Sequence, residues 1–307
     1  MRKEMRAYVG VTDYGWFDLL RGLPHPDDIN FWQPSGNQSF KALDPGELFL
    51  FKLHSPNNYI VGGGWYAHSS LLPISLAWES FGPGNGARSL SDMRSSVAKY
   101  RHQDVNGKDD YTIGCILLEQ PFFLPENLWI PAPRDWSPSI VQGKTYNLLV
   151  EPGLSLWNQL QTVLPVASTI SDNLARYGQP YVAMPRLGQG AFRVLVTDAY
   201  ERRCAVTNER TLPALEAGHI KPYSEQGEHV VSNGILLRRD LHALFDKGYV
   251  TITPSMILEV SRKIKEEFDN GKDYYQLHGK LVRVPDNPTN RPSQKYLEWH
   301  NTNVYRG

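Results

Sequence analysis

Cysteine is scarce in this sequence. The 307 residues include only Cys115 and Cys204, and the first lies in an apolar run at 113–118 that is typical of a buried strand. A small secreted domain held together by several disulfide bridges is therefore excluded. Because Cys204 has no second cysteine nearby, we also expect no structural zinc held by four ligands.

Long apolar stretches are missing as well. No run approaches the roughly 18 residues that a membrane helix needs. The N-terminal segment 1–12 has no apolar stretch long enough for a signal peptide. We therefore expect a cytoplasmic protein with no membrane partner.

An excess of one charge is the third absence. Lysine and arginine number 32, aspartate and glutamate number 32, and the net charge at pH 7 is zero. No broad positive field attracts a polyanion, although a local basic groove is compatible with this balance. With 41% hydrophobic and 21% charged residues, the composition is that of a globular protein and excludes a disordered chain or a coiled coil.

The length and the distribution of tryptophan indicate two domains. A chain of 307 residues is about twice a typical domain. Six of the eight tryptophans lie in the first 150 residues, whereas segments rich in lysine and arginine lie later in the chain. We predict one domain at 1–150, a helical linker at 151–185 and a second domain at 186–307.

The order of the predicted elements is that of an α+β protein. In the first domain, strands are expected at 6–11, 47–53, 59–66, 112–119 and 128–131, helices at 71–81 and 89–101, and a bridging helix at 154–164. In the second, we expect a helix at 192–202, short strands around Ala205 and His219, a helix at 240–246, strands at 257–264 and 281–284, and a closing helix at 294–300. A mixed sheet or small barrel with helices fits the first domain.

Three short motifs in the second half carry the chemistry. They are AGHIKP at 217–222, NGILL at 233–237 and HALFD at 242–246, and His219, Asn233 and His242 are separated by 14 and 9 positions. Together with CAVT at 204–207, these residue types and spacings resemble the HNH nucleases, the ββα-metal group, over about 186–252. The resemblance implies a ββα fold and a metal-dependent endonuclease in the second domain.

The residue types support the same chemistry. Hydrolysis of a phosphodiester requires an activated water and neutralised charge on the phosphate. His219, at the end of a predicted strand, can take a proton from water because the pKa of a free imidazole lies near neutrality. His242 and Asp246 are four residues apart on a helix, so they share one face and can bind a single Mg²⁺ or Mn²⁺ ion. The resemblance adds a catalytic role for His242, and for Asn233 the role of tying the loop that orients the base.

One position departs from the HNH pattern. Many relatives have an Asp or His metal ligand directly before the catalytic histidine, and here that residue is Gly218. Glu216 could supply the missing carboxylate, directly or through water. Arg238, Arg239 and Lys221 are the predicted contacts to DNA, with one arginine pointing to solvent as the alternative.

The first domain carries a second and looser resemblance. The segments PGELFLFK at 45–52 and YIVGGGWY at 59–66 are similar to the PUA-type barrels, which include the SRA, EVE and YTH readers of modified bases. This resemblance implies a pocket in which a flipped base stacks between aromatic rings. The candidate pocket residues are Tyr14, Trp16, Phe17, Asn30, Phe31, Trp32, Gln33, Trp65, Tyr66 and Trp78, and we expect two or three of the rings to line the pocket and the others to lie in the core.

A base reader joined to an HNH nuclease resembles the modification-dependent restriction enzymes. This implies hydrolysis of double-stranded DNA that carries a modified base, with cytosine expected, and it explains how an unmodified host genome is spared. Two alternatives stay open: a non-catalytic reader whose nuclease unit is degraded at Gly218, and a nuclease whose first domain binds protein or RNA. Cutting both strands with one active site per chain needs two chains or two visits, so a homodimer is one expected arrangement.

Overall fold

The computed structural model describes residues 5–24, 26–102, 109–170 and 187–307. The chain divides into two compact units, Met1–Ala191 and Phe192–Gly307. Of the predicted linker at 151–185, the part up to residue 170 is helical and the remainder lies outside the described residues. A search of the described residues found no helix that is long and apolar enough to cross a membrane.

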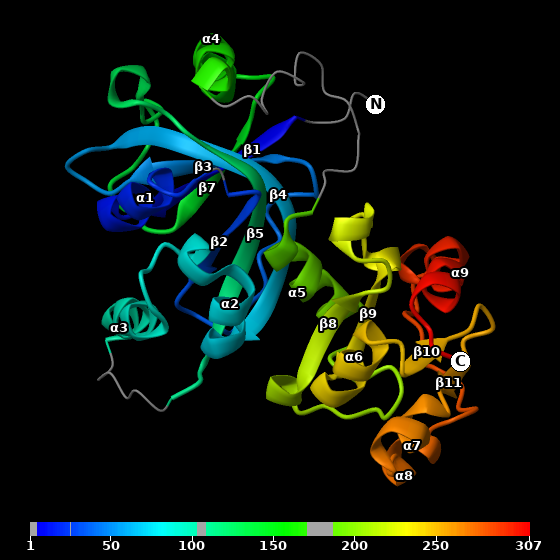
Figure 1. The fold of residues 1–307 in the computed structure, drawn as a ribbon. Helices are drawn as coiled ribbons and strands as arrows, with labels where there is room; N and C mark the ends of the chain where they lie inside the picture. Colours follow the sequence, from blue (N-terminus) through cyan, green and yellow to red (C-terminus); the bar gives the residue numbers. More distant parts are fainter. Residues whose placement is uncertain (1–4, 25, 103–108, 171–186) are drawn as a thin grey trace. The chain divides into compact units, whose positions relative to one another are not determined.

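The N-terminal unit is built on one mixed sheet (Figure 1). Its elements are β1 (Arg6–Thr12), α1 (Tyr14–Arg21), β2 (Asp28–Gln33), β3 (Leu48–Leu53), β4 (Tyr59–Pro73), α2 (Ile74–Phe81), α3 (Leu90–Arg101), β5 (Thr112–Phe123), β6 (Ile130–Pro131), β7 (Gly143–Asn147) and α4 (Gly153–Ile170). The strand order is β2-β5-β4-β3-β1-β7, with β6 paired to β4. Only the β1–β3 pair is parallel among these described strands.

The sheet is open rather than closed. In the described part of the chain its path ends at β2 on one side and at β7 on the other. The expected α+β class is confirmed, whereas the closed barrel is not found. Pairing of β1 with β3 instead gives the sheet a mixed character, because it joins one parallel pair to the antiparallel ladder.

Strand β3 shows how the sheet separates two hydrophobic cores. Side chains alternate along a strand, so Phe49 and Phe51 face one side while Leu48 and Leu50 face the other. The first pair belongs to an aromatic cluster that α1 helps to form. The second pair belongs to an aliphatic cluster that includes buried side chains of α4. The sheet therefore buries both of its faces.

The first domain differs from the sequence prediction at four elements. Helix α1 and strands β2 and β7 lie where no helix or strand was predicted, although Asp13 accepts the backbone N–H of Trp16 at 2.8 Å and is an N-cap signal for α1. The helix expected at 71–81 begins only at Ile74, because β4 continues through Pro73. The prediction for α3 is confirmed, with Ser89 accepting from the N–H of Asp92 at 3.1 Å.

The C-terminal unit contains two strands followed directly by a helix. Its elements are α5 (Gln189–Ala199, which enters this unit at Phe192), β8 (Leu215–His219), β9 (Gly234–Arg238), α6 (Arg239–Asp246), β10 (Val250–Ile252), β11 (Leu258–Val260), α7 (Lys263–Phe268), α8 (Lys272–Tyr275) and α9 (Gln294–Asn303). Strands β8 and β9 are antiparallel, and α6 lies against both (Figure 1). A ββα unit is therefore present.

Three strand predictions in this unit differ from the structure. Ala205 lies in a turn and only donates one hydrogen bond to Leu236 of β9, at 2.8 Å, so the second strand of the ββα unit is β9 and not a segment near Ala205. The strand expected at 257–264 is shorter, because α7 begins at Lys263. The segment 281–284 forms no strand and contributes only an isolated bridge between Leu281 and Ile257. The closing helix is confirmed as α9.

Candidate active site

The ββα unit brings the predicted residues together by local geometry. Strand β8 ends at His219, which pairs with Gly234 of β9, and α6 begins immediately after β9. The first turns of α6 therefore lie against β8. A Cβ atom on Gly218 would lie 2.2 Å from Nε2 of His242, so the two histidines occupy neighbouring positions on this unit.

The ring of His219 is held on two sides. It stacks on Phe192 of α5, with ring centroids 3.8 Å apart and planes 8° apart. Its Nε2 atom lies 2.9 Å from Nδ1 of His229. Burial lowers the pKa of His219 to about 4, and the charges of His229 and His242 act in the same direction. The imidazole is therefore neutral at pH 7 and has a lone pair that can accept a proton.

His229 is a residue that the sequence motifs do not single out. One nitrogen of the His219–His229 pair carries the shared proton, so this hydrogen bond fixes the orientation of the His219 ring. Tyr223, which is exposed, stacks on His229 with centroids 4.7 Å apart. A histidine inside the loop that leads to Asn233 was the available signal, but spacing alone does not show which way such a loop folds.

Asn233 ties that loop to the end of β8. The side chain is fully buried, and its Oδ1 accepts from the N–H of Lys221 at 2.9 Å. Its Nδ2 donates to the carbonyl oxygens of Lys221 and Glu228, both at 2.9 Å. All of these contacts hold backbone between positions 221 and 228, so Asn233 fixes the segment that carries His229.

His242 lies between two carboxylates. Its Nδ1 is 3.0 Å from Oε2 of Glu216, and its Nε2 is 3.5 Å from Oδ1 of Asp246. Burial is the largest single influence on the pKa of Glu216 and raises it, but hydrogen bonding to His242 and the charges of His242 and Arg193 together lower the pKa below its usual value. The carboxylate of Glu216 can only accept, so Nδ1 of His242 donates to it, and Nε2 is the nitrogen that faces Asp246.

Glu216 has a partner that the sequence did not indicate. Arg193 of α5 donates from Nη2 to Oε1 of Glu216 at 3.1 Å. Glu216 therefore contacts Arg193 with one oxygen and His242 with the other. This arrangement places Glu216 behind the imidazole, on the nitrogen opposite to the one that faces Asp246.

The predicted DNA contacts differ in their surroundings. Arg238 forms an ion pair with Asp240, with Nη2 and Oδ2 2.5 Å apart, and is partly exposed. Arg239 is exposed. Lys221 places its ammonium 5.4 Å from the ring centroid of Trp299. The charge of Arg238 is thus already balanced by a neighbour.

A metal ion would find a partial set of ligands here. Across the residues that can be described, no group of three or more His, Cys, Asp and Glu side chains has the arrangement of a metal site. Nε2 of His242 and a carboxylate oxygen of Asp246 nevertheless face each other, and this donor set fits a divalent ion that keeps water and substrate phosphate as further ligands.

The aromatic residues predicted for a base pocket divide into two groups. Trp16, Phe17, Phe31 and Tyr66 are buried members of the aromatic cluster beside α1, where they pack against other rings. Tyr14 is exposed, and Trp32, Gln33, Trp65 and Trp78 are partly buried. Asn30 is fully buried on β2. The first group is committed to the core, so a pocket would have to be built from the second group and from Asn30.

Comparison with known proteins identifies the C-terminal chemistry. Residues 204–253 match the family model described as HNH endonuclease. The C-terminal unit thus carries an HNH endonuclease domain, and the protein is a nuclease of the hydrolase class. No curated protein matches the chain.

Three solved structures show similarity at low identity. A modification-dependent restriction endonuclease, TagI, is 13% identical, covers 96% of this chain and 81% of its own, and gives a TM-score of 0.31. The ASCH protein from Zymomonas mobilis is 9% identical, covers 51% of this chain and 94% of its own, with a TM-score of 0.31. The type IV phosphorothioation-dependent restriction endonuclease ScoMcrA is 12% identical, covers 78% of this chain and 49% of its own, with a TM-score of 0.21.

Proposed function

We propose that this protein is a modification-dependent restriction endonuclease that hydrolyses double-stranded DNA. The observation that supports this most is the packing of His242 on Gly218, directly beside His219, within the segment that matches the HNH endonuclease family. Zero net charge supports dependence on a modification, because weak attraction to plain DNA leaves affinity to specific contacts.

His219 is the proposed general base. Its neutral ring accepts the proton of the attacking water, while His229 holds Nε2 and Phe192 holds the face of the ring. In this proposal Nε2 of His219 donates to His229, so Nδ1 of His219 is the nitrogen that takes the proton. Asn233 acts through the backbone of the loop, and its role is to position His229 and His219.

His242 and Asp246 are the proposed ligands of one divalent ion. Glu216 and Arg193 orient His242 from behind, so that Nε2 is presented toward Asp246. Glu216 is therefore better placed to hold His242 than to bind the ion directly. When bound, a magnesium or manganese ion supplies positive charge to the phosphate oxygens.

The N-terminal unit is the proposed reader of the modified base. A base cannot present its Watson–Crick edge to a protein while it is paired, so recognition requires that it flips out of the duplex. The partly buried Trp32 and Trp65 offer ring surface for stacking. A modified cytosine is the proposed target.

The packing around Gly218 supports a role for this glycine other than loss of nuclease activity. A side chain at this position would overlap the imidazole of His242, since even a Cβ atom would lie 2.2 Å from Nε2. Glycine thus makes room for His242. The alternative of a non-catalytic reader loses the observation on which it was based.

Cleavage of modified DNA tests the proposal. Purified protein with Mg²⁺ or Mn²⁺ is expected to cut phage DNA that contains modified cytosine and to leave the same DNA without the modification intact. His219→Ala should abolish cutting while DNA binding persists. Equal cleavage by the wild type and by His219→Ala would contradict the proposed mechanism.

A further inference from the structure

Strands β2, β5 and β4 carry buried polar side chains on one of their two faces. The register places side chains of the three strands in rows across the sheet. One row contains Ile29, Leu118 and Tyr66, and the neighbouring row contains Asp28, Glu119 and Trp65. The first row belongs to the aromatic core. The second row shares its face with Asn30, two residues along β2, so polar side chains gather on the face opposite that core.

Asn30 presents a hydrogen-bond acceptor in a fixed direction. Its Nδ2 donates to Oδ1 of Asn85 at 2.9 Å and lies 3.4 Å from Sγ of Cys115. Asn85 uses its own Nδ2 to donate to the carbonyl oxygens of Ala77 and Gly82, so its Oδ1 must accept from Asn30. The orientation of the Asn30 amide is therefore set. Its Oδ1 is buried and has no hydrogen-bond partner.

Glu119 presents a second unsatisfied group on the same face. The residue is fully buried, and neither carboxylate oxygen has a hydrogen-bond partner. Burial, with the nearby charge of Asp28, raises the pKa of Glu119 to about 8. An unpaired carboxylate is strongly disfavoured in such surroundings, so the group is a neutral acid at pH 7. It then offers one O–H donor and one acceptor oxygen.

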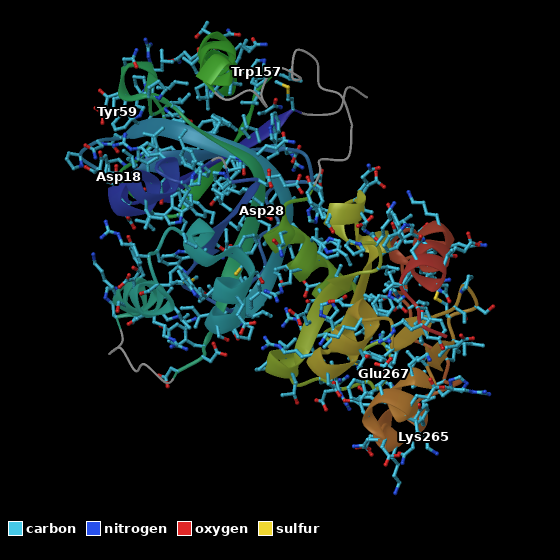
Figure 2. The ribbon with its side chains drawn as sticks, in the orientation of Figure 1. Asp18, Asp28, Tyr59, Trp157, Lys265 and Glu267 are labelled. Carbon is cyan, nitrogen blue, oxygen red and sulfur yellow. The ribbon has the colours of Figure 1, made fainter. Side chains whose placement is uncertain are left out.

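The two groups lie close enough to contact one small ligand. Glu119 is directly opposite Asp28, and Asn30 is two residues further along β2, so Asn30 and Glu119 are diagonal neighbours about 7 Å apart at their Cα atoms. Trp65 pairs with Glu119 from the other side, and Trp32 shares the face of Asn30. Asp28, labelled in Figure 2, marks the end of this row. The donor of Glu119 and the acceptor of Asn30 thus share one face of the sheet with Trp65 and Trp32.

We propose that Glu119 and Asn30 read the Watson–Crick edge of the flipped base and select one in which an amino group stands beside an unprotonated ring nitrogen. This inference rests on the proposed function. The acid O–H donates to the ring nitrogen, and the acid carbonyl and Asn30 Oδ1 accept from the amino group. Cytosine and adenine share this edge. Thymine, uracil and guanine lack it, because their corresponding ring nitrogen carries a proton.

The cost of the two groups in the free protein supports a ligand role. A buried polar atom without a partner destabilises a fold, and here two such residues share one face. A base that reaches these residues supplies the missing hydrogen bonds. In the free protein these unpaired groups lower the stability of the fold. In the complex the base supplies their hydrogen bonds and removes this cost.

Pairs of bases that differ only at this edge test the inference. Binding is measured with the full chain carrying His219→Ala, so that DNA stays intact. Two pairs of duplexes differ only at one base: 5-methylcytosine against thymine, and 5-hydroxymethylcytosine against 5-hydroxymethyluracil. Two further duplexes contain N6-methyladenine or no modification. We expect one member of the amino-bearing set to bind at least about tenfold more tightly than its partner without the amino group.

Two variants of Glu119 separate recognition from folding. In Glu119→Gln, the amide keeps one donor and one acceptor, so the preference should persist. In Glu119→Leu the edge contact is lost, and the preference should fall by about 10- to 100-fold. Glu126→Gln, an exposed carboxylate of the same unit, is the matched control and should change nothing. Thermal unfolding of each variant establishes that it is folded.

The outcomes distinguish this inference from the proposed function. If no modified duplex binds better than the plain one, modification dependence fails and the inference fails with it. If a modified duplex is preferred but Glu119→Leu keeps the preference, only the inference is overturned. Equal binding of bases with and without the amino group also overturns it, as does loss of the preference in a folded Glu119→Gln variant.

Discussion

The two units carry their polar groups in different ways. In the C-terminal unit, Glu216, His219, Asn233, His242 and Asp246 lie within one ββα unit, and each has a hydrogen-bond or ion-pair partner. In the N-terminal unit, Asn30 and Glu119 come from strands far apart in sequence, and each has an atom without a partner. The first set is assembled for chemistry in the free protein. The second is assembled for a ligand that the free protein lacks.

Among variants of the two units, loss of the general base should reduce activity the most. His219→Ala removes the group that takes the proton from water, and a reduction of cleavage by about 10³-fold is expected from typical general-base contributions. Single-turnover cleavage of modified DNA measures it. Binding of the same DNA, recorded without metal, is the control and should be unchanged. An undiminished rate would show that the ββα unit is not the active site.

The buried His300 of α9 should make the C-terminal unit sensitive to acid. Its Nδ1 lies 2.8 Å from Oγ1 of Thr251 and its Nε2 3.0 Å from the carbonyl oxygen of Phe245, and burial lowers its pKa to about 4. The unfolded chain binds a proton near pH 6.5 and the folded one only near pH 4, so stability falls as pH decreases between these values. The loss amounts to about 3 kcal/mol, at 1.36 kcal/mol per pKa unit.

Denaturant unfolding across that pH range measures the effect. His300→Gln should unfold with a shallower dependence on pH, because it has no group that titrates there. His219 has the same sense of shift and stays in both proteins, so the difference between the two curves reports on His300 alone. Identical slopes for the two proteins would refute the assignment.

Glu216→Gln tests whether this carboxylate orients His242 through its contact with Nδ1. The amide no longer fixes the proton on Nδ1, and a decrease of metal affinity or activity by about 10- to 100-fold is expected for such a supporting residue. Isothermal titration with Mn²⁺ and cleavage rates measure it. Asp246→Asn is the comparison, since loss of a direct ligand should weaken Mn²⁺ binding more. A larger effect from Glu216→Gln would make Glu216 the ligand.

Glu119→Gln should have the smallest effect of these variants, and it should increase the stability of the protein. At pH 7 the buried acid must take up a proton when the chain folds, whereas an amide does not titrate, so a gain in stability of about 1 kcal/mol is expected. Thermal unfolding of the full chain measures it. A clear loss of stability would mean that Glu119 has a structural role in the N-terminal unit.

The sequence predicted which C-terminal residues lie together, because these residues are local in the chain. The motifs around His219, Asn233 and His242 lie within one strand-loop-strand-helix unit, so spacing alone brings them together. It failed for His229 and Arg193, whose contacts depend on how a loop folds and where α5 packs. It also placed a strand at Ala205, since a short apolar segment in a turn resembles a strand.

The N-terminal unit was predicted less well because its site depends on register. Helix α1 and strand β2 were taken for loops, and without β2 the row that joins Asp28 to Glu119 could not be seen. Most of the candidate rings were expected in the core, and Trp16, Phe17, Phe31 and Tyr66 lie there, but the sequence did not show which rings these would be. Burial and the pairing of polar atoms are properties of the fold, and no local pattern shows them.

Cleavage of two DNA molecules of the same sequence, one with modified cytosine and one without, tests the central claim most directly. The wild-type protein with Mg²⁺ or Mn²⁺ should cut the modified molecule and leave the plain one, and His219→Ala should cut neither. Cleavage of both molecules at equal rates, or of neither under any divalent ion, would contradict a modification-dependent nuclease.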